Sequence, residues 1–305
     1  MSNLIVFPNS NTPTSAGMQS IHTPEPMPSA SGATFEDYQG KANDFFTVDN
    51  LPLTSPRGTV ANKRGIFVGN NCINVVSPSY EVHQPLDVYK TFLNVAESTG
   101  LEVKRVLNNP VNGGLLISAE YSQCKIIGED HAVNLTFYTS HCGKYKTFLT
   151  LDLLRIACFN QTPVLYKNKD RHIFAEKHYR NALDISLIES TLEGIPASIE
   201  AYNTQCELLE DTVMSWEDFV EYYIEANKVN REAKQFQTKI DKLKAIYCNA
   251  PGQRELGANQ YKAYNAVTYM NTHEGRETAL KQERVYLQGS ADSIKHLRGL
   301  QSIAA

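Results

Sequence analysis

Positively charged and aromatic side chains alternate along residues 144–180. This segment contains eight basic and three acidic residues, a net charge of +5; the whole 305-residue chain carries −4, which leaves −9 for the remainder. Cations bind the phosphates of a single nucleic-acid strand, and aromatic rings stack on its unpaired bases for about 1–3 kcal/mol per base. The residues that we expect to make such contacts are Lys144, Lys146, Arg155, Tyr166, Lys167, Lys169, Arg171, Lys177 and Arg180.

The same segment has an ordinary structural interpretation. Aromatic residues at strand or helix spacing usually belong to a core, and a modest excess of basic residues usually lies on a solvated face. We expect the first half, through Thr162, to be partly buried. Residues 167–180 are therefore the better candidates for contacts with a phosphate backbone.

Three polar clusters could carry chemistry. In the first, residues 140–144, the thiol of Cys142 lies next to His141 in the sequence, a combination used in nucleophilic catalysis. Neighbouring residues on a strand point to opposite sides, which argues against a working pair. A zinc site that includes both residues is an alternative, although structural zinc sites usually draw their ligands from closely spaced pairs. We assign no metal and no cofactor.

The second and third clusters, residues 155–162 and 265–273, are rich in amides and hydroxyls. We interpret them mainly as buried hydrogen-bond networks that fix packing. Together with the first cluster they contribute His141, Cys158, Asn160, Thr162, Asn265 and His273. The alternative is a hydrolase or nuclease built on His141, Arg155, Asn160 and His273. No phosphate-binding glycine loop or zinc-protease motif occurs, so we assign no catalytic residue and favour a protein that is not an enzyme.

An acidic segment contrasts with the basic one. Residues 186–225 contain ten acidic residues and no lysine or arginine. This surface would repel a phosphate backbone. It instead favours a second hypothesis, in which the acidic helices bind another protein.

The elements that must position these residues follow from hydrophobic spacing. Residues 1–60 are rich in Ser, Pro, Thr and Asn, and we expect a disordered or loosely docked tail that could bind a partner. Short strands are predicted at 65–69, 73–77, 102–107, 115–121, 133–139 and 145–150, with a helix at 87–98 that Gly100 ends. The spacing of Leu151, Leu154 and Cys158 predicts a helix.

Beyond about residue 172 the pattern is almost wholly helical. Pro196 suits the first turn of a helix, and Ser215 with Asp218 indicates a capping box. Further helices are predicted at 236–247, 259–271 and 290–303. Strands followed by helices predict an α+β fold, a small antiparallel sheet with packed helices followed by a mainly helical C-terminal half. We expect one domain over residues 61–305, β-rich at 65–150 and helical at 151–305.

Composition excludes several classes of protein. No run approaches the roughly 18 consecutive apolar residues of a membrane helix, and the N-terminus lacks a signal-peptide pattern. The six cysteines are scattered, which predicts reduced and mostly buried thiols. The expected location is the cytoplasm.

The clusters, taken in order, resemble a phage- and plasmid-like family known as domain of unknown function 932. The resemblance spans about residues 65–305 and rests on Ile66-Phe67-Val68-Gly69-Asn70, Asn112-Gly113-Gly114, Thr139-Ser140-His141-Cys142-Gly143, Arg155 to Thr162, Arg171-His172 and Asn265-Ala266-Val267-Thr268. Gln161 is an insertion relative to the usual family pattern, and Cys142 stands where the family has an aspartate. The resemblance implies a bacteriophage setting among genes of DNA metabolism. In that setting the acidic segment 186–225 would bind a host or phage protein, as in a counter-defence factor.

The sequence therefore favours an accessory protein that binds, and in one version anneals, single-stranded DNA during replication or recombination. The predicted order of hairpin, strand and helix looks like the core of single-strand annealing proteins. Because such proteins commonly form rings, we expect a homo-oligomer.

Overall fold

The computed structural model describes residues 45–55, 58–157, 160–167, 172–176, 187–273 and 279–304. The chain divides into two compact units. Unit 1 comprises residues 1–121, 134–150 and 172–193; unit 2 comprises residues 122–133, 151–171 and 194–305. The assignment of residues 61–305 to one domain stays a prediction.

A three-stranded antiparallel sheet belongs to unit 1. Its strands, in spatial order, are β1 (Asp49–Ser55), β2 (Gly58–Val68) and β3 (Asn71–Val76). Val48, Ile66 and Val68 form its small core, against which Ile73 packs. The strands predicted at 65–69 and 73–77 are confirmed. β1 and the first residues of β2 lie within the segment whose composition suggested a tail.

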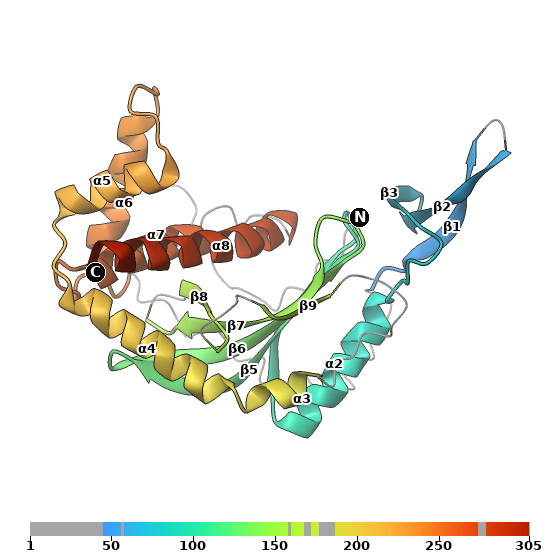
Figure 1. The fold of residues 1–305 in the computed structure, drawn as a ribbon, viewed down its shortest axis with the longest axis horizontal. Helices are drawn as coiled ribbons and strands as arrows, with labels where there is room; N and C mark the ends of the chain where they lie inside the picture. Colours follow the sequence, from blue (N-terminus) through green and yellow to red (C-terminus); the bar gives the residue numbers. More distant parts are fainter. Residues whose placement is uncertain are drawn as a thin grey trace, which may run out of the picture. The chain divides into compact units, whose positions relative to one another are not determined.

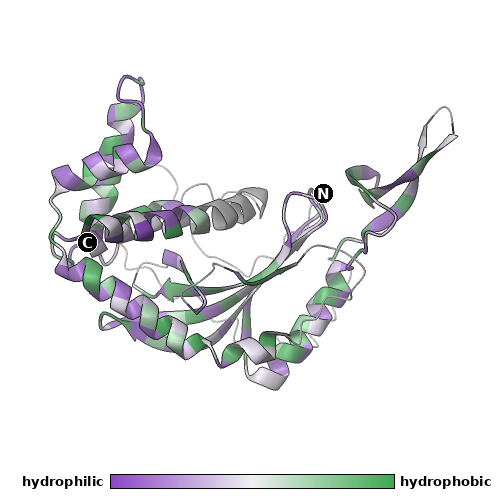
Figure 2. Ribbon diagram, in the orientation of Figure 1, coloured by the Kyte–Doolittle hydropathy of each residue, from purple (hydrophilic) through white to green (hydrophobic). Residues whose placement is uncertain are grey.

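Helix α2 (Pro85–Thr99) also belongs to unit 1. Proline stands in its first turn, and Gly100 ends it in the left-handed conformation with φ of 72°. Val88, Tyr89, Phe92 and Ala96 are buried at helical spacing, and polar and apolar residues alternate along the ribbon (Figure 2). The predicted helix and its glycine stop are confirmed. A short helix much later in the chain, α3 (Leu187–Leu192), contacts α2.

A six-stranded sheet contributes strands to both units. Its order is β4 (Glu102–Asn109), β5 (Gly114–Ile126), β6 (Glu129–Ser140), β7 (Thr147–Arg155) and β8 (Asn160–Val164), and β9 (His172–Glu176) also pairs with β7. β4 and β5 form the predicted antiparallel hairpin. β8 pairs with the second half of β7 and β9 with its first half.

The helix predicted around Leu151 and Leu154 is wrong, because β7 continues to Arg155. Leu151, Asp152 and Leu153 are all fully buried. A strand that is covered on both faces reads as a continuous apolar run without period-two alternation. The run Leu151-Asp152-Leu153-Leu154 therefore resembles a helix face although it forms a strand, and the first described helix after β7 begins at residue 187.

Unit 2 contains five helices among its described residues: α4 (Ile195–Asp211), α5 (Trp216–Asn227), α6 (Phe236–Asn249), α7 (Gln260–His273) and α8 (Ala279–Ala304). Pro196 stands in the first turn of α4, and Ser215 caps α5 by accepting from the backbone N–H of Asp218, as predicted. α7 lies beside α8 (Figure 1) and also contacts α4, α6 and β8. The α+β class, antiparallel sheets followed by a mainly helical half, is confirmed. The described residues contain no helix long and apolar enough to cross a membrane.

Candidate nucleic-acid interface and the buried polar network

Residues 143–146 form the exposed part of the connection between β6 and β7 in unit 1. Lys144 and Lys146 are both exposed, and between them Tyr145 is 39% exposed. The Tyr145 ring meets the buried Tyr138 ring edge-on, with 5.8 Å between centroids. The loop therefore presents an anchored aromatic ring between two cations.

The buried side chain of His141 supports this loop from the end of β6. Its Nδ1 lies 2.9 Å from the hydroxyl oxygen of Tyr80, and its Nε2 lies 3.0 Å from the carbonyl oxygen of His83. Because a carbonyl oxygen only accepts, Nε2 carries the proton and Nδ1 accepts from the tyrosine. Burial lowers the pKa of His141 to about 4, so the ring is neutral near pH 7.

The backbone on either side of this histidine is also fixed. The N–H of His141 donates to the carbonyl of Gly113, and Nδ2 of Asn74 donates to the carbonyl of His141 at 3.0 Å. Gly143 has φ of 77°, and a Cβ there would lie 2.8 Å from Nδ2 of Asn74. The left-handed backbone favours glycine here, and any larger residue would also displace the Asn74 side chain.

A second cation and ring pair lies in unit 2. The Nζ of Lys167 lies 5.3 Å from the ring centroid of Tyr166, within the range of a cation–π contact. The N–H of Lys167 donates to Oγ of Ser198, which fixes the backbone at the start of α4. The remaining predicted contacts with nucleic acid, Lys169, Arg171, Lys177 and Arg180, lie outside the described residues.

Arg155 occupies a different environment, because it is only 2% exposed. Its Nε donates to Oε2 of Glu129 at 2.7 Å, and Nη2 donates to Oε1 of Glu129 and to the carbonyl of Gly252. The hydroxyl of Tyr261 donates to the same carboxylate at 3.1 Å. The predicted contact of Arg155 with nucleic acid is therefore corrected: a buried guanidinium that is paired with a carboxylate does not face a phosphate.

The second and third polar clusters come together in unit 2, where β8 meets α7. Asn160 donates from Nδ2 to the carbonyl of Asn265 at 3.2 Å and to Oγ1 of Thr268 at 3.3 Å. Thr272 receives the backbone N–H of Gln161 at 3.2 Å. Asn160, Asn265 and Thr268 are all buried. These two clusters thus form a hydrogen-bonded joint that fixes β8 on the helix.

The remaining network residues are distributed as follows. Thr162 is buried on β8, and His273 at the end of α7 packs on Tyr269 with 4.2 Å between ring centroids. Cys158 lies outside the described residues. His141 belongs to unit 1, whereas Arg155, Asn160 and His273 belong to unit 2. Each of these four side chains has contacts of its own. Among the described residues, no hydrogen bond or ion pair joins any two of these four side chains.

The described residues around Cys142 do not form a nucleophilic pair of Cys142 with His141. Both ring nitrogens of His141 are taken by Tyr80 and His83, and Oγ of Ser140 lies 3.1 Å from the Cys142 sulfur. Within the described ranges, no group of three or more His, Cys, Asp or Glu residues has an arrangement that could hold a metal ion.

The cysteine prediction is only partly right. The five described cysteines are free thiols, but only Cys206 is buried, whereas Cys72 and Cys248 are exposed. The expectation of mostly buried thiols is therefore wrong for this part of the chain. Cys72 is the second residue of β3 and Cys248 lies near the end of α6, and both side chains meet solvent. Burial raises the pKa of Cys206 to about 12, which makes this thiol unreactive.

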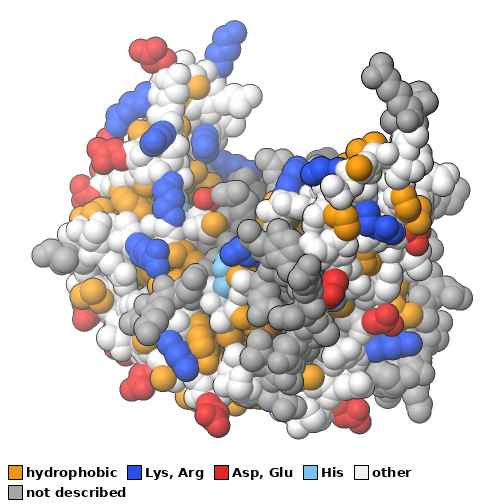
Figure 3. Space-filling view, turned by 45° about the vertical axis from the view of Figure 1, so that its right-hand side comes forward, with side chains coloured by type: hydrophobic (Ala, Val, Ile, Leu, Met, Phe, Trp, Pro, Cys, Tyr) orange, Lys and Arg blue, Asp and Glu red, His pale blue; other side chains and the backbone are white. Residues whose placement is uncertain are grey.

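Sequence reasoning missed a basic surface on and before α6. Residues 228–244 contain six basic and two acidic residues, a net charge of +4. Lys239, Lys242 and Lys244 are exposed, and two of them lie over aromatic rings of α5: Lys239 over Tyr223 and Lys244 over Trp216, each 5.8 Å from the centroid. A count of local net charge would have found this surface. Figure 3 shows Lys and Arg side chains projecting from the visible face in small groups.

Comparison with known proteins identifies the family. A model of the family described as Domain of unknown function (DUF932) matches residues 72–293. The chain belongs to this family. The DUF932 match covers the loop of residues 143–146, Arg155 with Glu129, and the joint between β8 and α7. Searches of curated proteins and of solved structures each found no match.

Proposed function

We propose that this DUF932 protein binds single-stranded DNA as an accessory factor in phage DNA replication or recombination. The observation that carries the proposal is the loop of residues 143–146, where an exposed and anchored tyrosine lies between two exposed lysines. Such a loop combines the two interactions that a single strand offers, phosphate binding by cations and base stacking on a ring.

Unit 2 adds support from two places. Lys167 with Tyr166 repeats the combination of cation and ring, and the α6 surface adds three exposed lysines. An exposed ring favours a single strand over a duplex, because duplex bases are already stacked on one another. Annealing of complementary strands, homo-oligomer formation and a location in the host cytoplasm are parts of this proposal.

The experiment is fluorescence anisotropy with a short labelled oligonucleotide over a range of salt concentrations. The wild-type protein is expected to bind with affinity that falls as salt rises. Each phosphate contact on a single strand contributes about 0.7 to the slope of log K against log salt, so the double variant Lys144→Ser/Lys146→Ser should lower the slope by about 1.4.

The control is the double variant Lys90→Ser/Lys125→Ser. It removes the same charge from exposed positions on α2 and β5. If both double variants lose affinity equally, binding follows net charge and the assignment of the loop is wrong. Absent or salt-insensitive binding by the wild-type protein would overturn the proposed function itself.

A further inference from the structure

The three-stranded sheet of β1, β2 and β3 has two faces, and neighbouring parts of unit 1 cover one of them. On the covered face, Val48, Ile66 and Val68 form the small core. An antiparallel sheet that packs on a core with one face usually presents polar residues on the other, towards water. The opposite face of this sheet, the outer face, is instead largely apolar.

Strand pairing places the residues of the outer face in two rows. Leu51 of β1 lies opposite Gly65 of β2, and Gly65 lies opposite Val75 of β3. Gly65 precedes the core residue Ile66, so this row points away from the core. Leu51 is 48% exposed and Val75 is 51% exposed. The second row consists of Asp49, Phe67 and Cys72.

The centre of the outer face is Gly65, which two apolar side chains cover. A Cβ at Gly65 would lie 2.9 Å from Cδ2 of Leu53 and 3.0 Å from Cζ of Phe67. Leu53 and Phe67 are both half-buried. Together with Leu51 and Val75 they form an apolar patch whose margins are open to solvent. An exposed apolar patch marks a place where another protein segment binds.

The chain itself contains a segment that matches this patch. Residues 4–7 read Leu-Ile-Val-Phe, the longest apolar run in residues 1–44. Residues 1–24 contain no Asp, Glu, Lys or Arg, so the run can be buried without removing a charge from water. Isoleucine, valine and phenylalanine are also the residue types that pack well on the surface of a sheet.

The position of this run in the chain brings it within reach of the patch. The described residues begin at Phe45, four positions before β1. Phe45 is held in unit 1, because its ring stacks on that of the buried Tyr89 with 5.1 Å between centroids. The connection from the run to Phe45 consists of residues 8–44, 37 in number. A chain spans up to about 3.3 Å per residue, so the run reaches the patch of its own molecule at high effective concentration.

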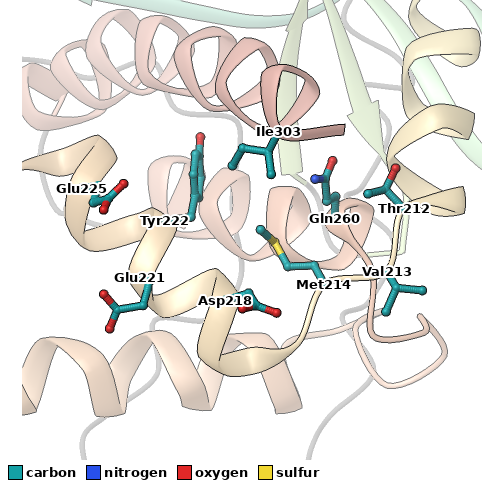
Figure 4. Close-up of a pocket in the computed structure, with 9 residues that line it drawn as sticks. All are labelled: Thr212, Val213, Met214, Asp218, Glu221, Tyr222, Glu225, Gln260 and Ile303. Carbon is teal, nitrogen blue, oxygen red and sulfur yellow. The ribbon is translucent and has the colours of Figure 1, made fainter. Parts of the chain in front are cut away.

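A second group of exposed aliphatic residues is a poorer match for the run. Val213 and Ile303 line a hollow in unit 2 together with three carboxylates of α5 (Figure 4). An apolar segment that bound there would remove water from these carboxylates, which costs free energy. In the two paired rows of the outer face, only Asp49 carries a charge.

We propose that residues 4–7 dock on the outer face of the three-stranded sheet in the same molecule, against Leu51, Phe67 and Val75. The docked run covers the exposed margins of the patch and ties the N-terminal segment to unit 1. It leaves the loop of residues 143–146 uncovered, because Asn74, which approaches Gly143, is paired with Ile66 and shares the core face. This contact is independent of the proposed binding of DNA.

Cys72 reports on the contact, because its exposed thiol lies in the same row as Phe67. The full chain is treated with N-ethylmaleimide, and mass spectrometry follows the labelling rate at each cysteine. The variant Ile5→Ser/Phe7→Ser should be labelled at Cys72 about tenfold faster than the wild-type protein, the factor expected when the run is docked about nine-tenths of the time. Cys248 of α6 is also exposed and should be labelled equally fast in both proteins.

A variant of the patch tests the place of docking. Leu51→Ser/Val75→Ser changes two half-exposed side chains, so the fold should tolerate it. Labelling of Cys72 should accelerate by the same factor as in Ile5→Ser/Phe7→Ser. The two pairs of substitutions combined should give no further increase, because each pair removes the same contact. An unchanged rate in Leu51→Ser/Val75→Ser would show that the run does not bind this patch.

The matched control is Met18→Ser/Ile21→Ser, which removes two apolar side chains of the same N-terminal region. It should leave the labelling of Cys72 unchanged. Equal acceleration by this control would show that no specific run binds, and equal labelling of the wild type and Ile5→Ser/Phe7→Ser would show that none docks. Protection of Cys72 should also be the same across a range of protein concentrations. Protection that increases with concentration would assign the run to a second copy and overturn docking within one molecule.

Discussion

The guanidinium of Arg155 and the carboxylate of Glu129 form a paired contact with two hydrogen bonds, one of them 2.7 Å long from Nε to Oε2. The arginine comes from the end of β7 and the glutamate from the start of β6, and the hydroxyl of Tyr261 on α7 joins the same carboxylate. This cluster ties the sheet to the helices within unit 2. The arginine therefore acts as a structural residue.

Removal of this arginine should destabilise the protein strongly. Arg155→Met leaves Glu129 without its partner, and a broken buried pair costs about 3–5 kcal/mol. The partly exposed carboxylate places the expected loss at the lower end of this range. Urea unfolding followed by the fluorescence of Trp216, the one tryptophan of the chain, measures the change.

The exposed pair of Arg231 with Glu221 provides the control, because both side chains are more than half exposed. Arg231→Met should cost about 0–1 kcal/mol. Similar losses in the two variants would contradict the structural role of Arg155.

Gly252 should resist substitution more strongly than another left-handed glycine. Gly252→Ala combines a φ of 72° with a Cβ only 2.9 Å from Nη2 of Arg155, whereas Gly128→Ala has a φ of 76° and no atom within 4 Å of the added carbon. Both variants carry a conformational cost of about 1–2 kcal/mol. The unfolding free energy should therefore fall further for Gly252→Ala than for Gly128→Ala. Equal losses would show that the Arg155 side chain moves away from the added carbon without loss of stability.

Local signals allowed the helices and their ends to be predicted from the sequence. Gly100 ends α2 and Ser215 begins α5 because each requirement lies within one turn of backbone. The β4–β5 hairpin could also be predicted, since turn residues separate two apolar runs. These features depend on neighbours in the sequence, so tertiary structure does not overturn them.

Features that depend on distant residues were not predictable. The sequence placed Arg155 among cations for nucleic acid because Glu129, its partner, lies 26 positions away and carries no signal of the pairing. The helix predicted from Leu151 and Leu154 was wrong for a related reason, because burial of both faces of β7 depends on distant parts of the chain. The hydrogen bond between Asn160 and Thr268 joins residues 108 positions apart, so its geometry could not be predicted from the sequence. The interpretation of these clusters as packing networks stays a prediction.

The ring of Tyr145 should contribute to binding of single-stranded DNA separately from the charges. Tyr145→Leu keeps an apolar side chain against Tyr138 but removes the stacking surface, which is worth about 1–3 kcal/mol per base. Affinity for a single strand is expected to fall about tenfold with an unchanged salt slope, as anisotropy titrations would show. Affinity for duplex DNA should change little, and an equal loss on both would argue against stacking.

Protonation of two buried histidines should reduce stability in acid. Burial lowers the pKa of both His141 and His296 to about 4, from an ordinary value of 6.5. Nδ1 of His141 accepts from the hydroxyl of Tyr80, so protonation of this ring also breaks a hydrogen bond. Nδ1 of His296 lies 3.0 Å from the hydroxyl oxygen of Tyr222. Between about pH 6.5 and pH 4, these two histidines are protonated in the unfolded chain and neutral in the folded chain.

The stability that these neutral rings contribute is therefore complete above about pH 6.5 and is lost as the pH falls towards 4. Each shift corresponds to a loss of about 3 kcal/mol at most. Urea unfolding at a series of pH values should show this decline, and His141→Gln and His296→Gln should each flatten it while lowering stability at neutral pH. A slope that neither variant changes would show that other groups dominate the acid response, such as the half-buried His83 and the buried His131, whose pKa values are also lowered by burial.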